Sequence, residues 1–160
     1  MRQFDTLTNF LLSKITDPTK KPRISVEGYD TIGDGGEMEG LFNGVTGQTP
    51  SQSPTDLQDA LFNDASGNQY AIDSPYNQVM FGALGGGVTD DTLPLQAAYT
   101  AISNTGSATG YMESKPLVFK KRFHIITRPL QVSGDSIYID GSMCTIRKTT
   151  NDLPAVTIPD

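Results

Sequence analysis

The sequence predicts a mainly β protein in which a helix precedes a stack of short strands. After Gly110 the hydrophobic period changes from about 3.6 residues to 2. Six short apolar patches follow, at 117–119, 123–126, 130–132, 137–139, 145–147 and 156–158. Each patch is too short to be stable alone, so each coil of chain needs a neighbour to bury its face. A clear helix start, from Thr89 to Pro94, stands in front of them.

A short amphipathic helix is expected at the beginning of the chain, from about Phe4 to Ile15. Its apolar side chains recur at helical spacing, and they are Phe4, Leu7, Phe10, Leu11 and Ile15. The helix should end before Pro18, because proline lacks a backbone donor and pushes the preceding residue to extended geometry. A helix of about three turns is marginal alone. We therefore expect this face to pack either on its own domain or on a partner, and the sequence leaves both open.

Residues 26–80 have the composition of a small glycine-rich β module. A strand that begins near Ile24 leads into 33–36, where dense glycines supply the positive φ of tight turns. Two further strand-forming patches, at 41–42 and 70–72, flank a loop rich in Pro, Ser and Thr. The module is therefore expected to contain short strands joined by turns.

The clearest helix in the chain begins at Thr-Asp-Asp-Thr-Leu-Pro, residues 89–94. Asp and Thr side chains accept bonds from the first free amides of a helix, and Pro is tolerated in its first turn. We expect both Asp90 and Asp91 to cap this helix. Its apolar stripe runs to about Ser103 and consists of Leu93, Leu95, Ala97, Ala98, Ala101 and Ile102. The small alanines would let the helix lie close against a flat surface.

Composition excludes several classes of protein. One Cys and one His cannot form an intramolecular disulfide or a CxxC or HExxH zinc site, and we expect no metal and no cofactor. Apolar residues make up 36% of the chain, which is low for a self-contained core. No apolar run approaches the ~20 residues of a membrane span, and no secretory signal begins the chain. The protein is expected to be made in the cytosol.

Charge is divided into three blocks. Residues 1–27 hold five basic and three acidic side chains, 28–113 hold none and eleven, and 114–160 hold seven and four. A segment without Lys or Arg cannot follow a phosphate backbone, so nucleic acid is a poor partner. The basic clusters at 20–23 and 120–122 are expected to be solvated turns.

No catalytic pair is expected among the carboxylates. Glycoside hydrolysis needs two of them about 5–10 Å apart across one sugar bond. Capping accounts for Asp90 and Asp91, whereas Glu37 and Glu39 lie in or beside a turn without an evident aromatic groove.

The remaining reactive residue types also have structural explanations. His124 stands in an alternating patch and is expected to face solvent, without a triad partner. Cys144 is expected to be a buried small hydrophobe. The glycines at 33–36 and 82–87 lack the Lys of a phosphate-binding loop, so both stretches are expected to be turns.

Several motifs follow one another in a specific order: VEGY at 26–29, GDGG at 33–36, DASG at 64–67, MFGA at 80–83, GVTDDT at 87–92 and LQAA at 95–98. Together they resemble the amino-terminal region of bacteriophage tailspikes of the pectate-lyase-like, right-handed parallel β-helix family. In that family such a segment opens the β-helix, and its helix caps the open end. Gly86 stands where the family usually has Asp.

The resemblance implies a homotrimer in the virion, assembled in the host cytoplasm. Residues 1–25 would anchor it to the phage tail, the baseplate or a companion tailspike, with the Phe4–Ile15 face as docking surface or trimer seam. Residues 26–80 would form the β module, and 81–160 the capping helix and first coils. Bacterial capsule or lipopolysaccharide would be bound further downstream, in a longer chain.

Two alternatives stay open. The parent protein could be a polysaccharide depolymerase with its active site on later coils or with some activity in this segment. It could also be a pectate-lyase-like enzyme outside any phage.

Overall fold

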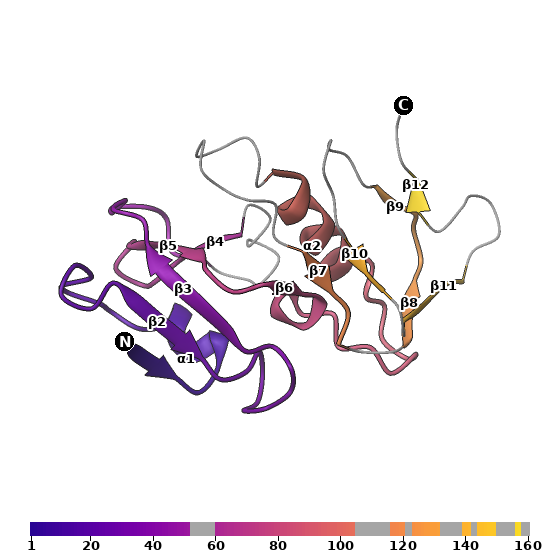
Figure 1. The fold of residues 1–160 in the computed structure, drawn as a ribbon, viewed down its shortest axis with the longest axis horizontal. Coiled ribbons are helices and arrows are strands. Elements are labelled where there is room, and N and C mark those ends of the chain that lie inside the picture. The colour runs from indigo at the N-terminus through magenta and orange to yellow at the C-terminus, as the bar shows by residue number, and fades with distance from the viewer. Residues whose placement is uncertain are drawn as a thin grey trace.

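The structure is a computed structural model that describes residues 1–51, 60–104, 116–120, 123–131, 139–141, 144–149 and 156–157. These residues are mainly β, as predicted, with few helices. A five-stranded sheet with helix α1 forms one part, and helix α2 with several short strands forms the other (Figure 1). None of the helices in these ranges is long and apolar enough to cross a membrane.

The first part is a sheet in the order β1–β2–β3–β5–β4. The strands are β1 (Arg2–Phe4), β2 (Arg23–Val26), β3 (Met38–Phe42), β4 (Leu61–Asn63) and β5 (Gln69–Ile72). β1 pairs with β2 in parallel, and the other neighbours are antiparallel. The strands predicted near Ile24, at 41–42 and at 70–72 are thus confirmed.

The core of this sheet is aromatic. Phe10 from α1 meets the rings of Phe62 and Tyr70 edge to face, with centroids 4.9 and 5.4 Å apart. All three side chains are fully buried. A Cβ on Gly40 in β3 would lie 2.8 Å from the Phe62 ring, so glycine is required for this close approach.

The N-terminal helix is shorter than the one predicted. α1 spans only Leu7–Leu11, because Arg2–Phe4 pairs with β2 as a strand. Thr6 is extended and its side chain accepts the Asn9 N–H at 3.2 Å, so the helix begins after it. The predicted helix from Phe4 to Ile15 was therefore wrong at both ends.

The apolar face of this segment packs in its own module, which is the first of the two alternatives. Leu7, Phe10 and Ile15 are buried, and Phe4 and Leu11 are partly buried against the same core. The buried Asp64 carboxylate accepts the Ile15 N–H at 3.3 Å, and so ties the segment to the module. Contact of Phe4 and Leu11 with a partner stays a prediction.

The glycine-rich stretch at 33–36 is a turn organised by one carboxylate. Asp34 accepts the backbone N–H groups of Tyr29, Asp30, Thr31 and Gly36 at 2.8–3.1 Å. Burial would raise the pKa of Asp34, but these four donors hold it below its ordinary value of 3.8. The predicted turn is thus confirmed.

The second part begins with β6 (Tyr76–Asn77) and the 3₁₀ helix η2 (Gln78–Phe81). Gly82 ends η2 at φ 90°, and the Tyr29 hydroxyl lies where a Cβ would stand. α2 follows at Thr92–Asn104, close to the predicted bounds. Its alanines, Leu95 and Ile102 are buried, but Leu93 is 58% exposed and does not belong to the predicted stripe.

Within the described ranges, six short strands follow α2, one in each predicted patch. They are β7 (Leu117–Val118), β8 (Phe123–Ile126), β9 (Leu130–Gln131), β10 (Ile139–Asp140), β11 (Thr145–Lys148) and β12 (Val156–Thr157). β10 pairs with β7, β11 with β8 and β12 with β9, all in parallel. Three successive strands therefore pair with the next three in the same order.

Candidate functional site

The candidate site is the end of the strand stack that faces α2, where three strand edges meet the preceding chain. The edge of β7 is covered by β6, which pairs with it in parallel. The Gln78 side chain extends this cover, since its Oε1 accepts the Lys120 N–H at 2.9 Å. This first edge is thus closed mainly by backbone.

The edge of β8 is covered by the residues that open α2. The Asp91 N–H donates to the Ile125 carbonyl at 2.8 Å, and Asp90 forms a parallel bridge with Ile125. The Thr92 hydroxyl accepts the Thr127 N–H at 2.9 Å. Backbone and side chain together close this second edge.

The edge of β9 is covered by the side chain of Gln96. Its Nε2 donates to the Gln131 carbonyl and its Oε1 accepts the Gln131 N–H, each at 2.9 Å. An amide side chain carries a donor and an acceptor, as a peptide group does. Gln96 therefore takes the place of a strand residue at this third edge.

His124 is the largest departure from the sequence prediction. It is fully buried, and its Nδ1 lies 2.6 Å from Asp91 Oδ2. A carboxylate oxygen accepts, so Nδ1 carries the proton. The expectation of a solvent-facing His without a partner was wrong, because β8 turns His124 and Ile126 inward and Phe123 outward.

Asp91 and Asp90 have different roles at this end. The Asp91 carboxylate accepts the N–H groups of Leu84 and Gly85, each at 3.1 Å, so it holds the 82–87 turn as well as His124. Asp90 accepts the Thr92 N–H at 3.0 Å and is the side chain that caps α2. Burial would raise the pKa of Asp90, but its bonds to Thr92 and Thr127 lower it below 3.8.

The stack is joined to the sheet module by polar contacts. Lys120 Nζ lies 2.9 Å from Glu37 Oε2, and this bond lowers the pKa of Glu37 below its ordinary value of 4.5. The basic cluster at 120–122 was expected to be a solvated turn, and Lys120 is exposed but paired. The other two residues of that cluster lie outside the described ranges.

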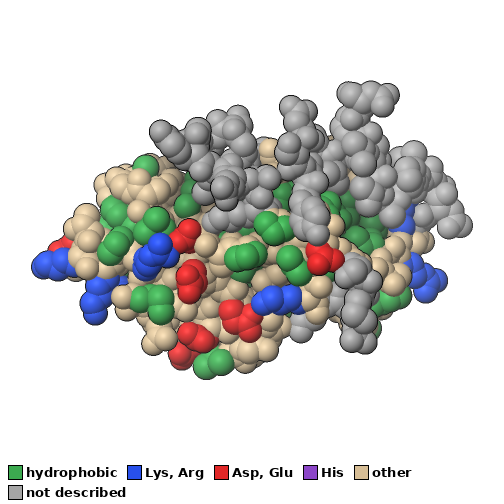
Figure 2. All heavy atoms as spheres, in the orientation of Figure 1, with side chains coloured by type: hydrophobic (Ala, Val, Ile, Leu, Met, Phe, Trp, Pro, Cys, Tyr) green, Lys and Arg blue, Asp and Glu red, His purple; other side chains and the backbone are tan. Residues whose placement is uncertain are grey.

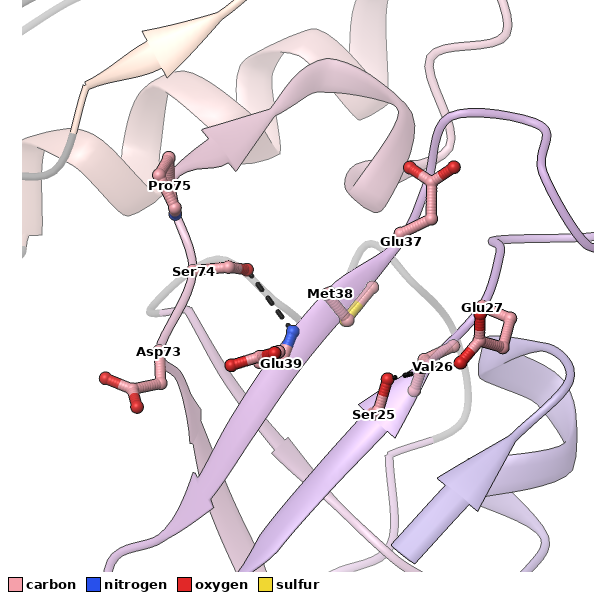
Figure 3. A pocket seen from close by; sticks show the side chains of 9 residues that line it. All are labelled: Ser25, Val26, Glu27, Glu37, Met38, Glu39, Asp73, Ser74 and Pro75. Carbon is pink, nitrogen blue, oxygen red and sulfur yellow. Dashed lines mark hydrogen bonds between the residues drawn. The ribbon is translucent and has the colours of Figure 1, made fainter. Parts of the chain in front are cut away.

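A pocket of about 420 Å³ opens in the sheet module beside β2 and β3 (Figure 3). Its lining includes four carboxylates, from Glu27, Glu37, Glu39 and Asp73. Figure 2 shows acidic side chains gathered over this face of the molecule. No aromatic ring is among the described residues that line it, and two of its carboxylates pair with Lys120 and Arg23.

Metal and thiol chemistry find no support in the described part of the chain. No three His, Cys, Asp or Glu side chains there are grouped so as to hold a metal ion. Cys144 is partly buried, and burial raises the pKa of its thiol to about 11, which favours the protonated thiol near neutral pH.

Sequence reasoning missed three residues of this site: His124 as the partner of Asp91, and Gln78 and Gln96 as edge covers. A weak signal exists for Gln96, which is a polar residue between the buried Leu95 and Ala97. The contacts join residues far apart in the chain, so local pattern cannot show them.

Comparison with known proteins gives structural matches. The fold is similar to that of full-length tailspike protein 2 of an Escherichia coli O157:H7 bacteriophage, with a TM-score of 0.53 and 22% identity. The match covers 87% of this chain and 16% of that protein. The enzymatically active domain of tailspike protein 2 from bacteriophage CBA120 also matches, with a TM-score of 0.47, 25% identity and cover of 78% and 16%. No family model and no curated protein matches the chain. The chain thus shares its fold with part of the first of these proteins, and it spans about a sixth of the length of that protein.

Proposed function

We propose that this chain is the virion-attachment and coil-priming segment of a phage tailspike that serves adhesion to glycans on the host surface. The observation that carries the proposal is the closed end of the strand stack, in which α2 and the residues around it satisfy three strand edges. The likeness of 87% of the chain to a full-length tailspike supports this role.

The stack supplies the priming function in this proposal. Pairing a strand with an existing edge needs no new nucleus, whereas a first coil has no template. In this chain the first coil would have a template, because β6, Asp91 and Gln96 form hydrogen bonds with the α2-facing edges of its three strands. Later coils of a right-handed parallel β-helix would add beyond β10, β11 and β12, and three copies would assemble as a homotrimer.

The sheet module supplies the attachment function. Residues 2–16 are part of its core, so deleting them would destroy the module and could not test docking. The exposed large apolar side chain on this segment is Leu12, which is 73% exposed and is flanked by the partly buried Leu11, so it is the side chain we assign to contact with a tail protein.

The test is a Leu12→Asp substitution in the complete protein, with Val88→Asp as matched control. Val88 is also exposed, at 88%, but lies in the turn before α2. We expect Leu12→Asp to lower the amount of protein in purified virions by about tenfold, which corresponds to about 1.4 kcal/mol of docking free energy. Equal incorporation of both variants would contradict docking through residues 1–25, and absence of the parent protein from virions would contradict the tailspike role.

We also propose that any glycan cleavage by the complete protein occurs outside these residues. The acidic pocket has four carboxylates, but Glu37 and Asp73 are held in ion pairs, and the described part of the lining offers no aromatic ring to stack on a sugar. Incubating the chain with capsule or lipopolysaccharide and assaying new reducing ends tests this. Release of oligosaccharide would favour the depolymerase alternative for this segment.

A further inference from the structure

The β9 edge is covered in a way that the other two edges are not. In a strand, the N–H and C=O of one residue point to the same side, and those of the next residue point to the opposite side. Gln131 directs both groups to α2, and both are bonded to Gln96. β12 lies on the other side of β9. Among the described residues, the Gln96 amide is therefore the group that is hydrogen-bonded to the edge of β9 opposite β12.

A side chain is a weaker cover than a backbone. β7 is covered by strand β6, and β8 by the backbone of Asp91, and neither can leave without unfolding its element. Gln96 is partly exposed on α2 and can leave by rotation of its own side-chain torsions. Its release would present the N–H and C=O of Gln131 to solvent.

We propose that Gln96 is an edge-blocking residue, which keeps the β9–β12 sheet from pairing with a strand of a second copy of this chain. An unpaired strand edge is a template for another chain, and proteins cover such edges or place charge on them. The two bonds of Gln96 occupy the donor and acceptor that a foreign strand would need at Gln131. This inference goes beyond the proposed function, because it concerns unwanted association between copies and holds whether or not the chain belongs to a virion.

The test compares four variants of the 160-residue chain. Gln96→Asn keeps the amide but is one methylene too short to reach Gln131, and Gln96→Ala removes the amide. Gln96→Glu keeps an acceptor for the Gln131 N–H and adds a charge that blocks the edge. Ser103→Ala is the control, since Ser103 lies two turns further along α2 and its hydroxyl bonds to the Tyr99 carbonyl rather than to Gln96 or β9.

Two measurements are made on each variant: mass by light scattering over a concentration series, and hydrogen exchange at the Gln131 amide by NMR. For Gln96→Asn and Gln96→Ala we expect exchange about tenfold faster, and species larger than those of the parent whose share rises with concentration. For Gln96→Glu and Ser103→Ala we expect the parent mass.

Faster exchange without larger species in Gln96→Asn and Gln96→Ala would overturn the proposal, because the edge would be open yet inert. Loss of the helical circular-dichroism signal in both would also overturn it, since Gln96 would then be needed for the fold itself. Larger species in Gln96→Glu would show that cover of the edge is not what matters. None of these outcomes depends on virion incorporation, so the proposed function is tested separately.

Discussion

Asp90 and Asp91 are adjacent carboxylates with different surroundings. Asp91 is 1% exposed and accepts from Leu84, Gly85 and His124, whereas Asp90 is exposed and bonds to two threonines. Removing an acceptor from buried donors leaves each donor without a partner, which costs more than losing a bond that water can replace.

We predict that Asp91→Ala lowers the free energy of unfolding by about 3–5 kcal/mol and Asp90→Ala by about 1 kcal/mol. The larger loss comes mainly from the buried His124 ring, which loses its partner, together with the two part-buried amides of Leu84 and Gly85, and the smaller loss comes from one helix cap. Urea denaturation followed by circular dichroism measures both. Equal losses would show that Asp91 is only a second cap, as its position in the sequence first indicated.

The buried position of His124 could not be predicted from the alternation of residues in its own strand. The patch Phe-His-Ile-Ile alternates in a way that fits either face, and the face is chosen by Ile126 and by Asp91, which lies far back in the chain. The Nε2 of His124 is buried without a hydrogen-bond partner in the described structure. A polar residue placed there is predictable only when its partner is known.

At the scale of elements, α1 is stabilised by its surroundings rather than by its length. A helix of five residues has little stability alone. Phe10 compensates for this, because its ring contacts Phe4, Phe62 and Tyr70 with centroids 4.9–5.4 Å apart. The helix is therefore part of the module's core.

We predict that Phe10→Ala lowers the free energy of unfolding by about 3–5 kcal/mol, because it leaves a cavity among aromatic rings. Leu12→Ala is the matched control, because Leu12 is the exposed C-cap residue of α1, two positions after Phe10. It should change the free energy of unfolding by less than about 0.5 kcal/mol. Thermal denaturation of both variants gives the comparison. A neutral Phe10→Ala would mean that α1 is not needed for the module.

The order of elements could be predicted from the sequence far better than their contacts. The α2 start and the six short patches depend on local signals, namely caps, glycines and a change of period, and all of them were found. The N-terminal helix was predicted too long because its apolar spacing outweighed Thr6, a single capping residue. Edge covers such as Gln78 and Gln96 depend on neighbours that only the fold brings together.

At the scale of the whole molecule, the three charge blocks of the sequence are brought together by ion pairs. Arg23 from the first block pairs with Asp73 of the acidic middle, and Lys120 from the third pairs with Glu37. Both pairs are largely exposed, so each contributes about 0–1 kcal/mol. They set which charges face each other, whereas the buried contacts supply most of the stability.

The acidic middle of the chain predicts how stability depends on pH. Asp34, Glu37 and Asp90 all have a pKa lowered in the fold, from ordinary values of 3.8, 4.5 and 3.8. A lowered pKa means that the folded state holds the proton less tightly than the unfolded state. The stabilisation is then fully present above the ordinary pKa values and is lost as pH falls through the lowered ones.

We predict that the urea midpoint is constant from about pH 7 to about pH 5 and falls steeply below about pH 4.5. Asp34→Asn separates the contribution of the 33–36 turn. Asparagine keeps one acceptor oxygen but loses the second, which serves Asp30 and Thr31, so the variant should be about 1–2 kcal/mol less stable at neutral pH. Its midpoint should also fall less than the parent's on acidification, because the side chain at position 34 no longer titrates. A parent midpoint that stays level down to about pH 3 would mean that these hydrogen-bonded carboxylates do not contribute to holding the fold.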